Sequence, residues 1–437
     1  MLIRINGAHV LDPGNIDEKK DIIIKDHLVE AILDPDENIT KTDIKIIDAK
    51  GMIVVPGLID IHVHLREPGY EYKETIETGL SAAVRGGFTA VCSMPNTHPV
   101  NDNSQVTKFI ISRANELGLS KVYPAGAITQ GSMGDRLAKI NDMKQAGIVA
   151  VTDDGNPVED SNMMRRVLGY CKGLKLPVFV HAEELSVANG GSMNEGPSAK
   201  SLGLKGIPNA AESIMVVRDI ALSKLIDAPV HFCHVSTKES VQAIRQAKKR
   251  GAKVTCETAP HYFTLTDEDV KDYNTNFKMN PPLRSKEDRQ AIIQGLIDGT
   301  IDMIASDHAP HSISDKDVGF DKAAFGIVGL ETSLSLSLKL VHDGLLTMEE
   351  LVNKMAKQPA KLIGINRDIK PGSMADLTII DPDVSYEINP ELFKSKSKNT
   401  PFSGFKVKGK PFLTMVNGKI VYQTDENLNK KRDDKDE

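Results

Sequence analysis

The stretch Leu58-Ile59-Asp60-Ile61-His62-Val63-His64 is a run of apolar and β-branched residues that ends in two histidines. Such runs are typical of strands buried in a parallel sheet. Similar runs follow along the chain, and the segments between them, such as Ser104–Leu117 and Lys238–Arg250, have helical composition. Eight strands that alternate with helices predict an α/β fold, a closed (β/α)8 barrel of the TIM type. The predicted strands are Leu58–His64, Phe88–Met94, Lys121–Gly126, Ile148–Asp153, Pro177–His181, Pro229–His234, Ala252–Glu257 and Ile301–Asp307.

The two ends of the chain have a different pattern of short β-like pieces separated by polar turns. Neither end carries enough strands for a sheet of its own. They therefore predict one small β-sandwich domain built from both ends. The predicted boundaries are 1–54 and 368–426 for the two parts of this domain, 55–367 for the barrel and 427–437 for a flexible charged tail. The terminal pieces are Leu2–Asn6, Asp21–Lys25, Leu28–Leu33, Ala375–Asp381, Phe405–Val407 and Thr414–Gln423.

Composition narrows the class of protein. The 437 residues suit a barrel of about 250 residues with a smaller attached domain. A formal net charge of −6 gives no support for nucleic-acid binding. No apolar run is long enough to span a membrane, and Met1-Leu2-Ile3-Arg4 does not resemble a secretory signal, so we expect a cytoplasmic protein. The four cysteines form no CxxC motif and are expected to be reduced and structural.

Potential metal ligands stand where five of the predicted strands end, at the barrel face that carries active sites. His62 and His64 are two residues apart, so strand geometry points both side chains the same way. Imidazole nitrogen and carboxylate oxygen are zinc ligands, and a metal would satisfy several buried polar groups at once. Spacing alone does not separate Asp153 from Asp154. The remaining candidates are His181, His234 and Asp307.

Other polar residues receive structural interpretations. His231 is three residues before the ligand candidate of its strand, so we expect it to face the helical layer. His308 is expected to point away from the site, and His261 to form a hydrogen bond in a loop. The segment 311–326 is predicted to be poor in regular structure and lies where an active-site lid would sit.

Long motifs along nearly the whole chain resemble the dihydroorotases, in particular their monofunctional bacterial class. Pro56–Gly69 (PGLIDIHVHLREPG) resembles the N-terminal signature of that family, and Ala305–His311 (ASDHAPH), with Lys316 further on, resembles its second signature. Met94–Thr97 and Asn280–Arg284 also resemble segments of the family.

The resemblance implies a reaction and a set of roles. The reaction is the reversible, zinc-dependent cyclisation of N-carbamoyl-L-aspartate to L-dihydroorotate and water in pyrimidine biosynthesis. In the hydrolytic direction, zinc-bound hydroxide attacks the ring amide and Asp307 is the acid/base. The implied metal ligands are His62 and His64 with Asp307 for one zinc, His181 and His234 for a second, and Asp154 as the bridge. The implied substrate contacts are Arg66, Asn96 and His311 to the carboxylate, Asn280 and the Phe325–Gly326 backbone to the ring, and His64.

Several alternatives stay open. Many relatives in the wider superfamily bridge two metals with a carboxylated lysine. Strand four has no lysine and offers Asp153 and Asp154 instead, so the number of zinc ions stays open at one or two, with two favoured. A rival function is that of a hydantoinase, dihydropyrimidinase or allantoinase. A rival of another class is a non-catalytic subunit that scaffolds a partner enzyme. The resemblance also implies a homodimer and an association with aspartate transcarbamoylase.

Overall fold

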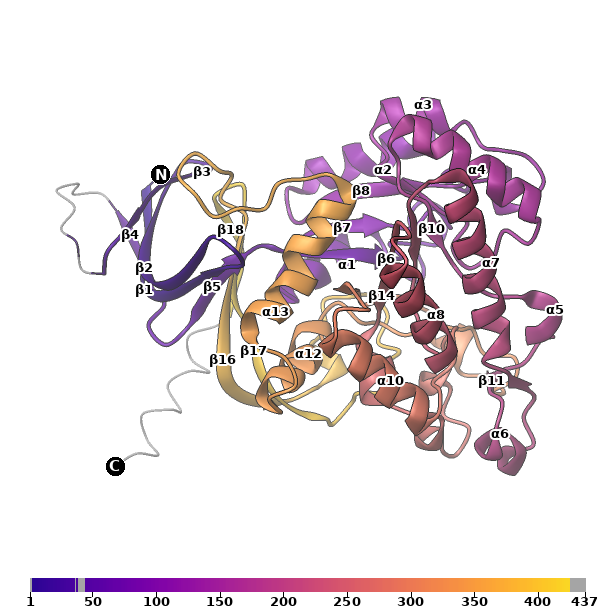
Figure 1. Ribbon diagram of the computed structural model, residues 1–437. Coiled ribbons are helices and arrows are strands. Elements are labelled where there is room, and N and C mark those ends of the chain that lie inside the picture. Colours follow the sequence, from indigo (N-terminus) through magenta and orange to yellow (C-terminus); the bar gives the residue numbers. More distant parts are fainter. Residues whose placement is uncertain (1, 36, 38–43, 425–437) are drawn as a thin grey trace.

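A closed barrel of parallel strands forms the larger part of the molecule (Figure 1). The computed structural model describes residues 2–35, 37 and 44–424, so the predicted tail at 427–437 lies outside the described residues. Two four-stranded sheets, in the orders β6-β7-β8-β9 and β10-β13-β14-β15, make up the barrel. The strands are β6 (Leu58–Val63), β7 (Phe88–Ser93), β8 (Lys121–Gly126), β9 (Ala150–Val151), β10 (Phe179–Val180), β13 (Val230–Phe232), β14 (Val254–Thr258) and β15 (Met303–Ile304).

Single parallel bridges close the barrel where the two sheets meet. Val151 pairs with Val178 at one junction, and Val63 pairs with His308 at the other. The predicted fold class is therefore confirmed, with a strand at each of the eight predicted places. Strands β9, β10 and β15 are each only two residues long. They are shorter than predicted because the chain leaves the hydrogen-bonded ladder before the polar residues that end each run.

Helices cover the outside of the barrel, and their ends follow from local sequence. At the start of α10, the Ser285 hydroxyl accepts from the N–H of Asp288, whose carboxylate accepts from the N–H of Ser285, a reciprocal cap. Helix α2 ends at Gly118, which has a φ of 62° and no Cβ to oppose it. No helix of the described part could cross a membrane. The helices are α1 (Ile76–Arg85), α2 (Ser104–Leu117), α3 (Ile140–Ala146), α4 (Ser161–Leu174), α5 (Leu185–Ala188), α6 (Pro197–Leu202), α7 (Ala210–Ile226), α8 (Lys238–Lys249), α9 (Pro260–Thr264), α10 (Lys286–Ile297), α11 (Ile313–Lys316), α12 (Ser333–His342), α13 (Met348–Val352), α14 (Gln358–Ile363), the π-helix η4 (Asn353–Lys357), and the 3-10 turns η1 (Gln130–Ser132), η2 (Asp267–Asp269), η3 (Thr275–Phe277) and η5 (Pro390–Leu392).

Apolar side chains pack on both faces of the barrel strands. One cluster, which includes Phe88, Phe232 and Leu296, joins strands to helices, and another joins Cys92 and Phe179 of the strands to Ile363 of α14. The four cysteines are free and buried, as predicted. The packed interior leaves the strand ends as the place where polar side chains converge.

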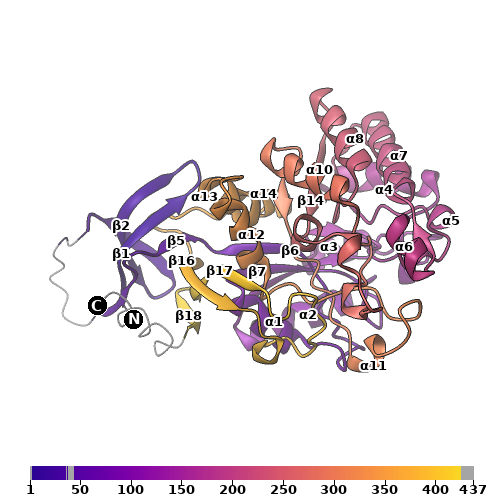
Figure 2. The same ribbon diagram turned by 90° about the horizontal axis from the view of Figure 1, so that it is seen from below.

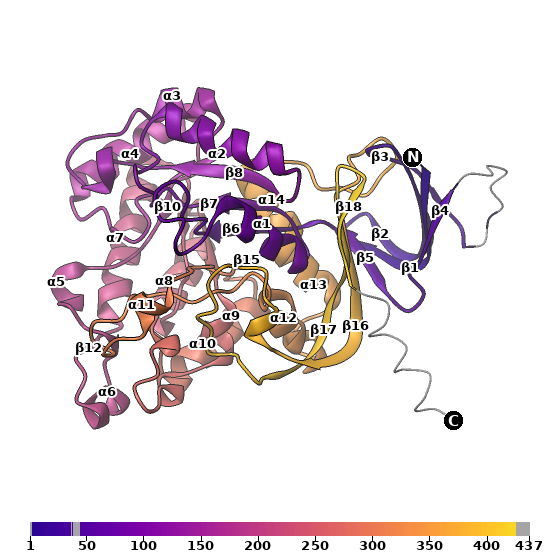
Figure 3. The same ribbon diagram turned by 180° about the vertical axis from the view of Figure 1, so that it is seen from behind.

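A second sheet, drawn from both ends of the chain, stands beside the barrel (Figures 2 and 3). Its order is β18-β17-β16-β5-β1-β2-β3, and β4 pairs with β1. The pairing of β5 with β16 joins the two terminal segments. The sequence did not predict β4 and β5, which are only four residues long. The strands are β1 (Leu2–Asp12), β2 (Ile16–Lys25), β3 (Leu28–Leu33), β4 (Lys45–Asp48), β5 (Ile53–Pro56), β16 (Leu377–Glu387), β17 (Lys406–Val416) and β18 (Lys419–Gln423), and a separate pair is formed by β11 (Met193–Asn194) and β12 (Gly206–Ile207).

Candidate metal centre and substrate pocket

Asp154 lies at the centre of a buried cluster that unites all six predicted metal ligands. Its carboxylate oxygens are 3.2 Å from His62 Nε2, 3.5 Å from His64 Nε2, 3.8 Å from His181 Nδ1 and 3.6 Å from His234 Nε2. The cluster therefore joins ligands from the ends of β6, β9, β10 and β13.

Asp307, after β15, completes the cluster. Its Oδ1 lies 3.2 Å from His64 Nε2 and 3.6 Å from His62 Nε2. On the opposite side, His181 Nδ1 faces His234 Nε2 at 2.9 Å. Among the described residues, three sets of side chains hold their ligand atoms within 4.8 Å of one another. Two of them consist of predicted ligands, namely His62, His64 and Asp307, and His62, Asp154 and His234, and the third is His62, Cys233 and Glu257.

Unpaired buried atoms show that the cluster suits a cation. His62 Nε2 and Asp154 Oδ1 lie 3.2 Å apart, but neither atom has a hydrogen-bond partner with acceptable geometry. A buried polar atom without a partner costs about 1–3 kcal/mol. A cation between the two would satisfy both, so the residues fit a metal.

Electrostatics support the same conclusion. Burial opposes charge on these groups, but the carboxylate of Asp154 raises the pKa of His62 well above its usual value. Burial likewise opposes ionisation of Asp154 and Asp307, but the positive charge of His62 lowers the pKa of both carboxyl groups. The anionic carboxylates thus require positive charge in their midst. A divalent cation with neutral imidazoles would supply it.

Outer partners fix the orientation of three imidazoles. Glu257 Oε1 lies 2.7 Å from His62 Nδ1, Asn96 Oδ1 lies 2.8 Å from His64 Nδ1, and Glu183 Oε2 lies 3.3 Å from His181 Nε2. Partners of this kind set which ring nitrogen faces a metal. Neither glutamate was predicted from the sequence, although Glu257 stands at the end of a predicted strand and so carried the same signal as the ligands.

The predicted orientation of His231 is wrong. Its Nε2 lies 3.2 Å from Glu257 Oε2, so His231 and His62 share one buried carboxylate inside the barrel. Alternation along β13 points His231 and Cys233 inward, and His234 turns to the same side because its φ is 36°. The prediction assumed that side chains alternate regularly up to His234, and this assumption placed His231 on the opposite face.

Left-handed backbone conformations gather at this face. Arg66, His234 and Asp307 have φ values of 63°, 36° and 48°, which is uncommon for residues with a side chain. The turn after His234 is held by Glu212 of α7, whose carboxylate accepts from the N–H groups of Ser236 and Thr237. Such strain concentrates at functional sites.

Three other polar residues, Asp153, His308 and His261, lie near the cluster without belonging to its six predicted ligands. Asp153 accepts from the N–H groups of Ile128 and Thr129 outside the cluster, which separates it from Asp154. His308 points to Glu74, away from the cluster as predicted. The prediction for His261 is wrong: it lies in α9, and its buried Nε2 has no hydrogen-bond partner. Burial lowers the pKa of His261 to about 4.

A cationic pocket adjoins the cluster. The buried Arg66 guanidinium donates from Nε to the Pro310 carbonyl at 3.2 Å and lies 3.3 Å from His311 Nε2. His311 Nε2 also lies 2.9 Å from the Phe325 carbonyl, which can only accept, so this nitrogen carries the proton. Nδ1 then accepts from Lys73 Nζ at 3.3 Å. Burial, with Arg66 and Lys73 beside it, lowers the pKa of His311 to about 2 and keeps the ring neutral.

The other predicted substrate residues surround this pocket less directly. Asn96 is bonded to His64, and Asn280 donates to Glu183 at 2.9 Å. Gly326 already uses its backbone: its N–H donates to the Lys278 carbonyl, and its own carbonyl accepts from Lys316 and Asn399. Gly326 also has a φ of 135°, and a Cβ there would lie 2.7 Å from that of Ala309, so only glycine fits.

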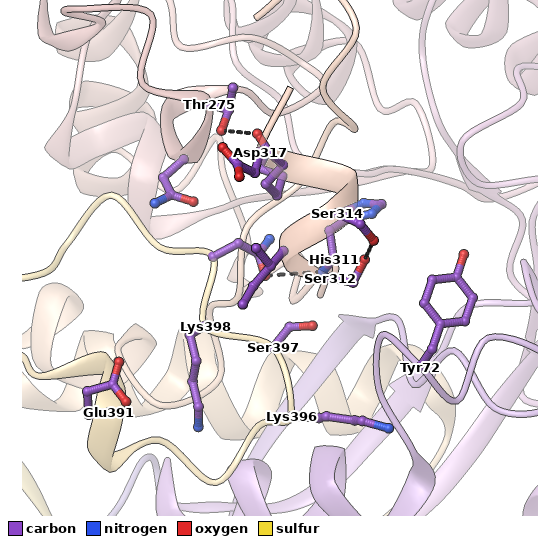
Figure 4. A pocket seen from close by; sticks show the side chains of 14 residues that line it. Tyr72, Thr275, His311, Ser312, Ser314, Asp317, Glu391, Lys396, Ser397 and Lys398 are labelled. Carbon is purple, nitrogen blue, oxygen red and sulfur yellow. Dashed lines mark hydrogen bonds between the residues drawn. The ribbon is translucent and has the colours of Figure 1, made fainter. Parts of the chain in front are cut away.

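A pocket of about 720 Å³ opens on the outer side of this segment (Figure 4). Its described lining includes His311 and none of the six cluster residues. The labelled side chains of Ser312 and Ser314 border it on one side, and Lys396 and Ser397 on the other. The segment 311–326, predicted to lack regular structure, contains the single turn α11.

Comparison with known proteins agrees with this architecture. The Dihydro-orotase-like family model matches residues 51–240. A dihydroorotase of Desulforapulum autotrophicum is 63% identical, over 97% of this chain and 99% of the relative, and one of Geobacter metallireducens is 53% identical, over 97% and 100%. Among solved structures, the L-hydantoinase of Arthrobacter aurescens has a TM-score of 0.86 at 29% identity, covering 96% of each chain. A dihydropyrimidinase of Brevibacillus agri has a TM-score of 0.83 at 24% identity, covering 97% and 95%.

The barrel, the sheet built from both ends and the histidine–aspartate cluster define a metal-dependent amidohydrolase. Within this class the full-length identity of 63% is decisive. The chain belongs to the dihydroorotase family.

Proposed function

We propose that this protein is a dihydroorotase, which interconverts N-carbamoyl-L-aspartate and L-dihydroorotate in pyrimidine biosynthesis. The observation that carries the proposal is the buried Arg66 guanidinium beside the cluster. Among the described residues, no carboxylate forms an ion pair with it. An unpaired buried cation is costly and matches a substrate that brings its own carboxylate. The uncharged rings of hydantoin and dihydrouracil would leave it unpaired.

Six side chains would hold the metal, which we propose to be zinc. His62, His64 and Asp307 would bind one ion, His181 and His234 a second, and Asp154 both. When bound, zinc activates water and polarises an amide carbonyl. The four imidazoles are held with a nitrogen toward Asp154, which supports a pair of ions over one.

The residues of the chain perform the remaining tasks. Arg66, Asn96 and His311 bind the substrate carboxylate, His64 lies against the substrate, and Asn280 and the Phe325–Gly326 backbone meet the ring. In hydrolysis, Asp307 takes a proton from the attacking water and delivers it to the ring nitrogen as the C–N bond breaks. In the biosynthetic direction, the carbamoyl nitrogen attacks the side-chain carboxylate carbon, and Asp307 takes the proton of that nitrogen and passes it to the departing oxygen. That oxygen takes a second proton from solvent and leaves as water. Burial opposes charge on Asp307, but the positive charge of His62 lowers its pKa, so the carboxylate is ionised, which is the form that can accept a proton.

The predicted partners extend this proposal. The substrate is a small molecule. A homodimer, an association with aspartate transcarbamoylase and a cytoplasmic location stay predictions from the sequence.

An assay of the purified, metal-replete protein tests the proposal. L-Dihydroorotate is offered beside dihydrouracil, hydantoin and allantoin, and zinc is counted on the same sample. Hydrolysis confined to L-dihydroorotate is expected, with two zinc ions per chain. Turnover of the uncharged rings would move the protein to the hydantoinases and contradict the carboxylate pocket. Absence of both zinc and turnover would indicate a scaffold subunit.

A further inference from the structure

A segment from the C-terminal part of the chain reaches back onto the barrel beside the substrate pocket. We call residues 393–400, between η5 and β17, the strap. Two buried carboxylates of the barrel hold its backbone. Glu331 accepts from the N–H groups of Lys394 and Ser395 at 2.9 and 3.1 Å, and Glu74 accepts from that of Lys396 at 3.0 Å.

Asn399, near the end of the strap, bonds to two substrate-side segments at once. Its Oδ1 accepts from the N–H of His311 at 3.1 Å, and its Nδ2 donates to the Ala309 carbonyl at 3.3 Å and the Gly326 carbonyl at 3.0 Å. Its backbone carbonyl accepts from the N–H of Val328 at 2.9 Å. The side chain is buried.

Both segments carry predicted substrate contacts, namely His311 in the first and Phe325–Gly326 in the second. In Figure 4, the strap residues Lys396, Ser397 and Lys398 lie across the pocket from the segment that begins at His311. A side-chain amide can accept one hydrogen bond and donate two without carrying charge. Asn399 uses this capacity to bond to the Ala309–His311 segment through both its oxygen and its nitrogen, and to Gly326 through its nitrogen. The Asn399 Nδ2 and the Lys316 ammonium both donate to the Gly326 carbonyl.

We propose that Asn399 is a positioning residue, which fixes the distance between the His311 and Gly326 segments and so shapes the substrate pocket from the C-terminal domain. This inference rests on the proposed function for its kinetic consequence. Asn399 touches none of the six candidate metal ligands, so its loss should affect substrate binding and spare the metal.

Asn399→Asp tests this role, because aspartate keeps the shape and the acceptor oxygen but loses both donated bonds. The matched control is Asn389→Asp, at the exposed start of η5, where the Asn389 side-chain oxygen accepts from the N–H of Glu391, a bond that aspartate keeps. We expect KM for L-dihydroorotate to rise about tenfold or more in Asn399→Asp, as for the loss of about 1.4 kcal/mol of binding energy. The zinc content and kcat should stay close to those of the wild type. The control should leave all three unchanged.

Hydrogen–deuterium exchange gives a second readout that needs no turnover. The amides of Gly326 and Val328, in the segment that loses a donated bond, should exchange faster in Asn399→Asp, while peptides around His62 and His181 should not change. If the variant fails to fold, Asn399→Ser removes the same amide without adding charge. An unchanged KM with unchanged exchange, or a loss of zinc in parallel with activity, overturns the inference. If the wild-type protein does not turn over L-dihydroorotate, the proposed function is contradicted instead. The hydrogen–deuterium exchange of Asn399→Asp, compared with that of the wild type, then tests the role of Asn399.

Discussion

At the scale of single residues, Asp154, Asp307 and Arg66 divide the proposed chemistry among them. Asp154 contacts all four histidines, Asp307 contacts His62 and His64, and Arg66 lies 3.3 Å from His311, beside the cluster. Metal binding, proton transfer and substrate binding should therefore respond to different substitutions.

Replacement of Asp307 by asparagine should separate proton transfer from metal binding. The variant keeps one ligand oxygen but cannot accept a proton, so we expect zinc to remain and kcat to fall by about 10²–10⁴-fold. Metal analysis and steady-state rates on one sample measure both. A rate close to that of the wild type would remove Asp307 from the proton-transfer step.

Replacement of Arg66 by alanine should weaken substrate binding with little effect on zinc. The guanidinium contributes a charge-assisted bond, whose loss costs about 1.5–3 kcal/mol, or roughly 10–100-fold in KM. KM for L-dihydroorotate and zinc content are the two measurements. Zinc loss with an unchanged KM would show that Arg66 is structural.

Glu257→Gln should lower the metal affinity of the cluster without removing a ligand. Glu257 orients His62 and is shared with His231, and loss of such a partner costs roughly 10–100-fold in metal affinity. Competition with a chromophoric chelator measures the affinity. The exposed Glu287→Gln is the control, and an equal affinity in the two variants would contradict the assigned role.

At the scale of elements, the strands end early and the turns after them carry the site. Strand β13 stops at Phe232, and His234 reaches the cluster only through its left-handed backbone. Helix α7 supports this turn through Glu212 and buries a second carboxylate, Asp219. Helices of the outer layer therefore hold the loops of the site in place.

Asp219 should make the stability of α7 depend on pH. Burial raises the pKa of Asp219 from 3.8 to about 6, although Arg218 opposes this shift. The folded chain then keeps a proton that the unfolded chain has lost, so this contribution to stability is present at low pH and falls as pH rises from about 4 to 6. Relative to wild type, Asp219→Asn should gain up to about 3 kcal/mol over that window.

Urea unfolding of both proteins between pH 4 and 8 measures this difference, and titration of the metal ligands cancels in the comparison. Asp142→Asn, on an exposed face of α3, serves as the control. A difference that does not change with pH would mean that Asp219 is ionised throughout.

At the scale of the whole molecule, the cluster ties strands from both barrel sheets together. Strands β6 and β9 belong to one sheet, and β10, β13 and β15 to the other. Metal binding at their ends should therefore stabilise the closed barrel as a unit.

Removal of metal should accordingly lower the stability of the entire barrel. A ligand that binds only the folded state stabilises it by about 4 kcal/mol at a thousand times its Kd. Calorimetry before and after chelation, and after zinc is restored, measures the change in Tm. His234→Ala should reduce that change, and an unchanged Tm on chelation would mean that the cluster holds no structural metal.

The sequence by itself determined the barrel, the use of both chain ends in one sheet, and the set of His and Asp residues at the strand ends. These follow from local patterns, because apolar runs specify buried strands and their ends specify one face of the barrel. The order of the strands along the chain then brings the six ligands together.

Only the tertiary structure decided which face His231 occupies and that Glu257, Glu183 and Asn399 support the site. Spacing left Asp153 and Asp154 open, the family resemblance favoured Asp154, and the structure places Asp153 outside the cluster. Each depends on a backbone turn or on a partner far away in the chain: φ at His234 reverses a side chain, and Asn399 meets Gly326 across 73 residues. The periodicity of the sequence contains no information about the turn at His234 or the contact of Asn399, because periodicity describes regular strands and these residues lie outside them.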